Sequence, residues 1–254
     1  MFKATAFEYR FRFILHGLIY MLGFWAPWVY IPFVAQHFAL TSDSTLLVLP
    51  LSMARVGWLP PFSRTTGNVM IIVALLFTGL GAWLRIWGSA YVGSSVVASR
   101  SMHGEAMLAD GPYRHTRNPL YLGTLLHTLG IALLMPPSGA IFAVVLLWIF
   151  QIRLARAEEP FLLARFGQDY ANYAKRVPRF LPMIAAQVPS AGAKPHWLQA
   201  VVGELYFVGA FVVLAAFGWD FNSTPLRQGI LISLGVWLVA RAFLPRAVVS
   251  EKTA

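Results

Sequence analysis

The chain has 254 residues, of which 58% are hydrophobic and 12% are charged, and its formal net charge is +10. A soluble domain of this length carries roughly twice that charged fraction, so the composition excludes an ordinary water-soluble enzyme and favours a membrane protein. No cysteine is present, which excludes disulfides, thiolate metal sites and cysteine nucleophiles.

Six apolar stretches span or nearly span a bilayer, for which about 20 residues are needed. They are residues 13–34, 69–88, 120–135, 139–154, 197–217 and 229–244. The third and fourth are short and lie on either side of residues 136–139, which predicts a tight helical hairpin. Residues 46–59 contain Pro50 and Arg55 and are too few for a span, so we expect an interfacial or re-entrant helix there. The expected fold is all-α: a polytopic integral membrane protein with about six transmembrane helices.

The basic residues are distributed unevenly over the loops between these stretches. With the basic N-terminus inside, residues 89–118, 155–196 and 245–254 are also cytoplasmic and hold most of the Lys and Arg, whereas the outward loops hold only Arg55, Arg64 and Arg227. This is the positive-inside bias, and it explains the charge without a nucleic-acid partner. The first apolar run is long, contains Pro27 and Pro32 and precedes no cleavage site, so we expect a retained helix rather than a signal peptide.

Residues 111–123 read GPYRHTRNPLYLG and form the first polar motif. Pro119 suits the first turn of the third apolar helix, because its missing N–H would have no partner there. Arg114 and Arg117 therefore precede a helix N-terminus, where free N–H groups favour an anion. The alternative is that both arginines only anchor the helix at the membrane surface.

Residues 158–182 form the second motif, EEPFLLARFGQDYANYAKRVPRFLP. Glu158 and Glu159 either neutralise nearby arginines, such as Arg156, or hold a cationic or polyhydroxyl ligand. Since Glu159 precedes a proline, we expect the helix to end or kink there. A helical apolar stripe then follows, which predicts an amphipathic helix over the cytoplasmic membrane face, and its members are Leu162, Phe166, Tyr170 and Tyr173.

Three features inside the apolar stretches have simpler interpretations. Arg85, between Trp83 and Trp87, is expected to anchor its helix at the interface. His127 is expected to be a hydrogen-bonded packing residue. Residues 79–81, Gly-Leu-Gly, favour close helix packing rather than nucleotide binding. The histidines show no metal-ligand spacing, so no metal site is expected.

Together, the two motifs resemble the isoprenylcysteine carboxyl methyltransferase and phospholipid methyltransferase superfamily. The resemblance covers about 72 residues and rests on Gly-Pro-Tyr-Arg at 111–114, Arg-Asn-Pro-Leu-Tyr-Leu-Gly at 117–123, the glutamate pair, Phe-Gly at 166–167, the two tyrosines and Arg-Val-Pro at 176–178. It implies a membrane methyltransferase that uses S-adenosylmethionine.

The resemblance also implies residue roles. The cofactor-binding residues would be Arg114, Arg117, Asn118, Tyr121, Gly123, Glu159, Tyr170, Tyr173 and Arg176, and the catalytic residues would be Arg153, Arg156 and Glu158. Arg153 or Arg156 would face the substrate. The family commonly has His where this chain has Asn118, and because an amide cannot act as a base near neutral pH, we expect this position only to bind.

The methyl acceptor stays open between an isoprenylcysteine-type carboxylate, a lipid amine and a small thiol, and an arginine at the site mildly favours the carboxylate. Two other functions are weighed: a sterol-type reductase using NADPH, and a non-catalytic membrane scaffold or transporter. The expected division is residues 1–98 for N-terminal helices, 99–182 for the methyltransferase core and 183–254 for a C-terminal helix pair. The active site should face the cytoplasm, at the inner membrane if the cell is bacterial.

Overall fold

A computed structural model describes residues 3–25, 64–92, 110–135, 137–220 and 223–243. Every regular element within these ranges is a helix, which confirms the all-α prediction. The expected helix at 46–59, the second half of the first apolar stretch, most of the 89–118 loop and residues 245–254 lie outside the described residues.

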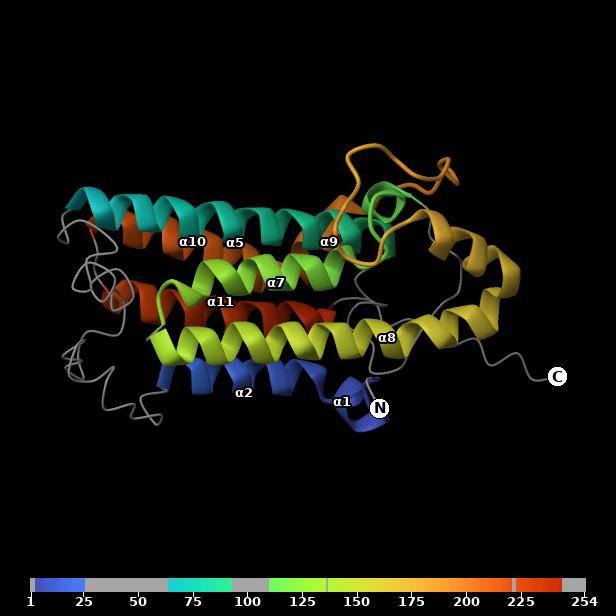
Figure 1. The fold of residues 1–254 in the computed structure, drawn as a ribbon. Coiled ribbons are helices and arrows are strands. Elements are labelled where there is room, and N and C mark those ends of the chain that lie inside the picture. The colour runs from blue at the N-terminus through green and yellow to red at the C-terminus, as the bar shows by residue number, and fades with distance from the viewer. Residues whose placement is uncertain (1–2, 26–63, 93–109, 136, 221–222, 244–254) are drawn as a thin grey trace.

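The long helices lie side by side in one bundle (Figure 1). α7 packs against both α5 and α8, α2 packs against α8, and α10 packs against α5 and α11. The elements, in chain order, are α1 (Ala6–Arg10), α2 (Arg12–Trp25), α5 (Arg64–Val92), η1 (Gly111–Arg114), α7 (Pro119–Ala132), α8 (Pro137–Arg176), α9 (Trp197–Gly203), α10 (Leu205–Asp220) and α11 (Ser223–Phe243).

α7 is the central helix, and small residues allow its neighbour to approach it closely. A Cβ atom added to Gly123 would lie 2.7 Å from Arg85 Cγ, and one added to Gly81 would lie 2.6 Å from the Gly123 carbonyl oxygen. This confirms that Gly81 serves helix packing. It also means that α5 and α7 are held in a fixed register beside the first polar motif.

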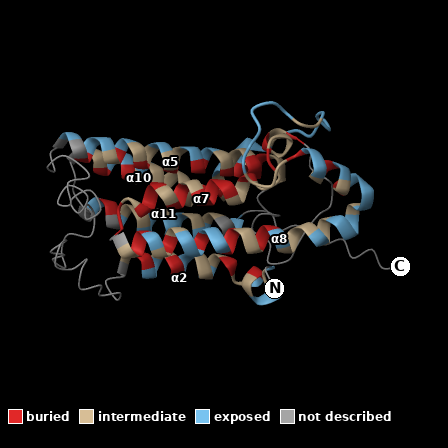
Figure 2. Ribbon diagram, in the orientation of Figure 1, coloured by how far each residue is buried: buried red, intermediate tan, exposed pale blue. Residues whose placement is uncertain are grey.

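Figure 2 shows exposed residues on the outer faces of the bundle, and many of them are large hydrophobic residues. On α5 the exposed apolar side chains recur at helical spacing, and they are Val69, Ile72, Leu76, Leu80 and Trp83. Such a continuous apolar stripe suits contact with lipid tails. Among the described residues, the helices at Gly67–Val92 and Ser138–Arg176 are long and apolar enough to cross a membrane, and α9 with α10, bent by 69°, would make a third span.

The apolar helices α2, α7 and α11 are shorter than a full span in the described part of the chain, so the six-span topology stays a prediction. The hairpin is confirmed: α7 ends at Ala132, α8 begins at Pro137, and the two helices pack together.

The expected break at Glu159 is wrong. α8 continues through Pro160 and leaves helical geometry at Gly167, where φ is +52° and ψ is −127°. This conformation strains any side chain with a Cβ, so glycine determines where the helix turns. After Gly167 the chain turns back toward η1, as Figure 1 shows on the amber part of α8. The kink therefore brings the second motif over the first.

Candidate functional site

The two motifs meet at the end of the bundle where α1 and η1 lie (Figure 1). Residues 177–188, here called the strap, follow α8 and run beside residues 114–118. Backbone hydrogen bonds join them: the Arg117 N–H donates to the Pro178 carbonyl at 2.8 Å, the Met183 N–H to His115 at 3.1 Å, and the Gln187 N–H to Arg114 at 2.9 Å. The strap and the first motif are thus one unit, although about 60 residues separate them in sequence.

Asp110 fastens the chain that follows the strap. Its carboxylate accepts hydrogen bonds from the Ser190 hydroxyl and from the N–H groups of Ala191 at 3.0 Å and Ala193 at 2.8 Å. Burial raises the pKa of the Asp110 carboxyl, but these hydrogen bonds outweigh burial and hold the pKa below its ordinary value. The loop end is therefore held by an ionised carboxylate.

Glu159 is the charged centre of this unit. It pairs with Arg117, with an Nη1–Oε1 distance of 2.9 Å, and with Arg179, whose Nε and Nη2 donate to its two oxygens at 2.7 and 2.6 Å. The Glu159 side chain is 19% exposed, so both pairs are partly shielded from water. Arg117 Nε is buried and has no hydrogen-bond partner within the described residues. One unused donor therefore remains beside the carboxylate.

Asn118 and Arg114 both hold the loop that follows α8. Asn118 Nδ2 donates to the Arg179 carbonyl at 3.0 Å, and Arg114 Nε donates to the Val188 carbonyl at 2.9 Å. An imidazole N–H could make the same bond as the amide, so the replacement of the family's histidine is compatible with this position. Arg176 is exposed at the end of α8. Any role of these residues toward a cofactor stays a prediction.

Glu158 points to a different set of neighbours from Glu159, because adjacent helical residues project about 100° apart. The hydroxyls of Tyr9 and Tyr121 both donate to its Oε1, at 2.8 and 2.6 Å. Tyr9 comes from α1 and Tyr121 from the first turn of α7. Three separate elements therefore converge on this half-buried carboxylate.

Arg153 contacts α1. Its Nε and Nη2 donate to the two carboxylate oxygens of Glu8 at 3.0 and 2.8 Å, and the Ala4 N–H donates to the Arg153 carbonyl at 3.0 Å. The hydrogen bond from Arg153 lowers the pKa of Glu8 to about 2. Arg156 is exposed on α8. Arg153 thus helps to fasten α1 beside Tyr9, and a role for either arginine toward substrate stays a prediction.

The apolar stripe of the second motif folds onto itself and onto η1. Tyr170 and Tyr173 are buried with Val177, and Leu162 and Phe166 pack against them. The Tyr173 hydroxyl donates to the Tyr113 carbonyl at 2.8 Å. The stripe therefore forms the apolar wall of the site. Gly123, by contrast, lies in the α5–α7 contact, two residues beyond Tyr121.

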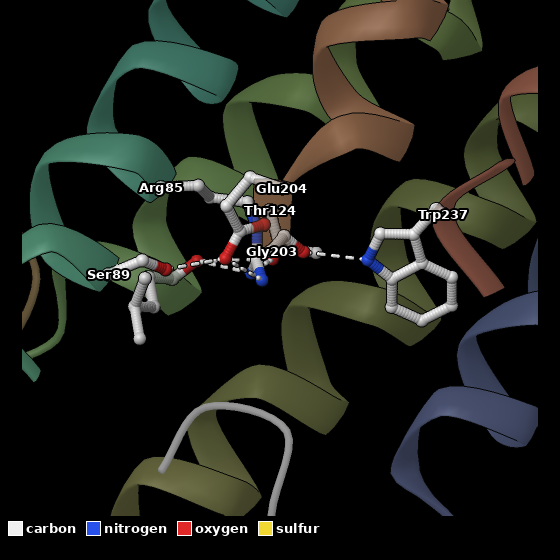
Figure 3. A network of polar contacts seen from close by, with 7 residues as sticks. Arg85, Ser89, Thr124, Gly203, Glu204 and Trp237 are labelled. Atoms are coloured by element: carbon white, nitrogen blue, oxygen red, sulfur yellow. Dashed lines mark hydrogen bonds and ion pairs between the residues drawn. The ribbon is translucent and has the colours of Figure 1, made fainter. Parts of the chain in front are cut away.

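A buried ion pair lies below the motifs, and it corrects the interpretation of Arg85 as an interfacial anchor. Arg85 Nε and Nη2 donate to Glu204 at 2.7 and 3.0 Å, and Arg85 Nη1 donates to Thr124 Oγ1 at 2.8 Å (Figure 3). Ser89 also donates to Glu204 at 2.6 Å. Arg85 is 8% and Glu204 1% exposed, because both lie between α5, α7 and α9 rather than at a surface.

His127 is a packing residue as expected, but without the expected hydrogen bond. Its ring contacts Phe207 at a centroid distance of 4.7 Å, and neither ring nitrogen has a partner within the described residues.

The family model for phospholipid methyltransferases matches residues 69–169, which contain most of α5, all of η1 and α7, and the glutamate pair. This match and the relatives below support the resemblance to the isoprenylcysteine carboxyl methyltransferase and phospholipid methyltransferase superfamily. Protein-S-isoprenylcysteine O-methyltransferase from Schizosaccharomyces pombe is 34% identical over 116 residues, which are 44% of this chain and 49% of that protein. Its counterpart from Mus musculus is 31% identical over 137 residues, 52% of this chain and 44% of that protein.

Cobalt-zinc-cadmium resistance protein CzcN from Cupriavidus metallidurans is 26% identical over 181 residues, 69% of this chain and 76% of that protein. The chain thus spans about half the length of the first two methyltransferase relatives and more of CzcN. No solved structure matches the chain.

Three contributors to this site were missed by sequence reasoning: Tyr9, Glu8 and Arg179. Arg179 follows the Arg-Val-Pro segment by one residue, so a search for a cation opposite the glutamates could have found it. Tyr9 and Glu8 lie about 150 residues from their partners, and no local pattern indicates that pairing.

Proposed function

We propose that this protein is a membrane-embedded methyltransferase that uses S-adenosylmethionine and methylates a lipophilic or small apolar acceptor at the cytoplasmic membrane face. The observation that supports it best is the joining of Glu159 to Arg117 and Arg179 across the two motifs. In this proposal six helices span the bilayer, and the part of α8 after Gly167 lies over the cytoplasmic surface. The match to the phospholipid methyltransferase family model favours methyl transfer over reduction or a scaffold role.

The residues present fit the amino-acid end of the cofactor. That end carries one ammonium and one carboxylate, and the site offers a carboxylate on Glu159 and a buried, unused N–H on Arg117. Charge-assisted hydrogen bonds of this kind are about twice as strong as neutral ones. The Tyr170–Tyr173 wall would contact the adenine, and the strap would cover the site and keep water out.

S-adenosylmethionine, when bound, supplies a methyl group made electrophilic by a sulfonium sulfur. The protein then needs mainly to hold both reactants in line, and such alignment can supply about 7–11 kcal/mol of the barrier. Glu159, Arg117 and Arg179 would fix one reactant from the aqueous side. Glu158, Tyr9 and Tyr121 would face the other reactant where α1, α7 and α8 meet.

Calorimetry with the purified chain in detergent tests the proposal. We expect S-adenosylmethionine to bind and NADPH not to bind. Glu159→Gln should weaken cofactor binding about 30-fold, because a charged hydrogen bond contributes about 2 kcal/mol. Asp169→Asn, which removes an exposed charge from the same helix, should leave binding unchanged. Binding of NADPH without S-adenosylmethionine would refute the proposal.

A further inference from the structure

The strap exposes apolar side chains at residues 181–184, here called the strap tip. Leu181 is 78% exposed, Met183 is 49% exposed and Ile184 is fully exposed. Residues 180–193 contain no charged residue at all. Single exposed apolar residues are ordinary, but a contiguous exposed apolar segment marks a surface that contacts another apolar body. The strap tip therefore has the composition of a docking surface.

The outward direction of the strap tip is fixed by its backbone. The buried Thr116 hydroxyl donates to the Phe180 carbonyl at 3.0 Å, and the Met183 N–H donates to the His115 carbonyl at 3.1 Å. The Met183 carbonyl also lies 2.8 Å from His115 Nδ1. Because the backbone bonds inward to the first motif, the apolar side chains cannot fold back without breaking these bonds. Their exposure is thus built into the strap.

A row of aromatic rings joins the strap tip to the outer face of the bundle. Trp197 of α9 stacks on Trp83 of α5 at a centroid distance of 5.9 Å, and Trp83 stacks on Trp87 at 6.3 Å. The Trp87 ring lies 6.0 Å from the ring of His115, which holds Met183. Trp83 and Trp197 are both partly exposed on this face. Tryptophans gather at the level of the lipid headgroups, so this row indicates the membrane surface beside the strap.

The length of α5 agrees with that level. The exposed apolar stripe of α5 begins at Val69, and a hydrocarbon core about 20 residues long then ends near Gly88, next to Trp87. Figure 1 shows the loop between α8 and α9 beside this end of α5, and the His196 N–H donates to the Ala90 carbonyl at 2.8 Å. The strap tip therefore lies at the boundary between lipid tails and headgroups.

The charges around the strap tip also suit lipid. Residues 170–203 contain no Asp or Glu, and their basic residues are Lys175, Arg176, Arg179 and Lys194. Arg176 and Lys194 are exposed on either side of the uncharged stretch. The cytoplasmic leaflet carries anionic lipids, which attract basic residues next to a membrane protein. An apolar segment between basic flanks matches the headgroup layer of that leaflet.

We propose that the strap tip inserts into the cytoplasmic leaflet, and that the bilayer thereby holds the strap over the candidate site. Arg179 lies two residues before the tip and binds both oxygens of Glu159, so the position of the tip governs that ion pair. The insertion rests on the topology proposed above and is independent of the reaction. Its effect on the cofactor rests on the proposed function.

Spin-label depth measurements on the full chain test the insertion. Because the chain contains no cysteine, Ile184→Cys gives a nitroxide a single attachment point. The labelled chain is reconstituted into vesicles of equal parts phosphatidylcholine and phosphatidylglycerol. We expect oxygen, which concentrates in lipid, to relax this label more than a water-soluble nickel chelate does. The matched control in the same loop is Ala191→Cys, where the nickel chelate should dominate, since Ala191 is held by the ionised Asp110 carboxylate.

Two results of this measurement overturn the proposal. A label at position 184 that the nickel chelate reaches better than oxygen would place the tip in water. An immobilised label that neither reagent reaches would mean that protein, such as a second copy of the chain, covers the tip instead of lipid.

Cofactor binding in the same vesicles tests the link to the site. Ile184→Asp should weaken S-adenosylmethionine binding about tenfold, as expected if the strap then covers the site in only about a tenth of the molecules. Because the Ile184 side chain is fully exposed, the variant should keep its unfolding temperature in detergent. Asn172→Asp adds the same charge on α8 and keeps an acceptor for Gln168, so its affinity should not change.

Equal affinity of Ile184→Asp and the unaltered chain overturns the proposal that the bilayer holds the strap over the site. If the unaltered chain does not bind S-adenosylmethionine, the proposed function fails, and the depth of the label at position 184 alone decides whether the tip inserts.

Discussion

Replacing Glu204 by alanine should destabilise the protein strongly. Arg85 would keep its buried position, with a side chain 10% exposed, and would lose both bonds to Glu204, its counterion among the described residues. Removing one partner of a buried pair costs about 3–5 kcal/mol, because the remaining charge stays out of water. Ser89 would lose its acceptor as well. For a chain of this size, each kcal/mol lowers the unfolding temperature by about 2–4 °C, so the expected fall is about 6–20 °C.

Thermal unfolding in detergent, followed by tryptophan fluorescence, measures this change. The matched control is Glu8→Ala, since the Glu8–Arg153 pair is more open, with both side chains 23% exposed. Such pairs contribute about 0–1 kcal/mol. The double variant Arg85→Met with Glu204→Leu should recover most of the loss, because no charge is left buried. An unfolding temperature for Glu204→Ala no lower than that of the control would refute the reasoning.

Three further outcomes are expected. Gly167→Ala should destabilise the protein by about 1–3 kcal/mol in the same unfolding assay, because alanine is strained at a φ of +52°. Arg179→Ala should weaken S-adenosylmethionine binding at least tenfold by calorimetry, whereas Lys175→Ala, at an exposed position of the same motif, should not. The pKa of Glu8 is lower in the folded state, at about 2 against 4.5, so the stability from its pair with Arg153 is present above about pH 4.5 and is lost as the pH falls toward 2. Hydrogen exchange of the α1 amides across that range would test it.

Sequence reasoning succeeded where a pattern is local. The hairpin follows from two apolar runs separated by a Pro-rich turn, and the start of α7 follows from Pro119. The stripe of Tyr170 and Tyr173 follows from helical spacing. In each case a few consecutive residues determine the backbone, so composition and spacing suffice.

Sequence reasoning failed at Pro160, where the local signal for a break was misleading, and at residues whose surroundings depend on distant partners. Pro160 weakens one turn of α8, yet the helix continues, and the break falls at Gly167, whose backbone conformation favours glycine. Arg85 between two tryptophans has the pattern of a surface anchor, but Glu204 draws it into the interior. Likewise, Arg153 finds Glu8 on α1. For these two arginines, no residue within one helical turn indicates which carboxylate is the partner.

The Arg85–Glu204 pair also has a consequence for membrane insertion, because its two residues are synthesised at different times. The two residues lie 119 positions apart in the sequence, and Arg85 is synthesised first. In the six-span topology proposed above, α5 enters the membrane while Glu204 has not yet been synthesised. At about 5–20 residues per second, Arg85 waits roughly 6–24 s for its counterion. During that interval a lone arginine in a membrane span costs about 2.5–3.5 kcal/mol. The apolar residues on either side of Arg85 must therefore keep α5 in the bilayer until Glu204 is synthesised and pairs with Arg85.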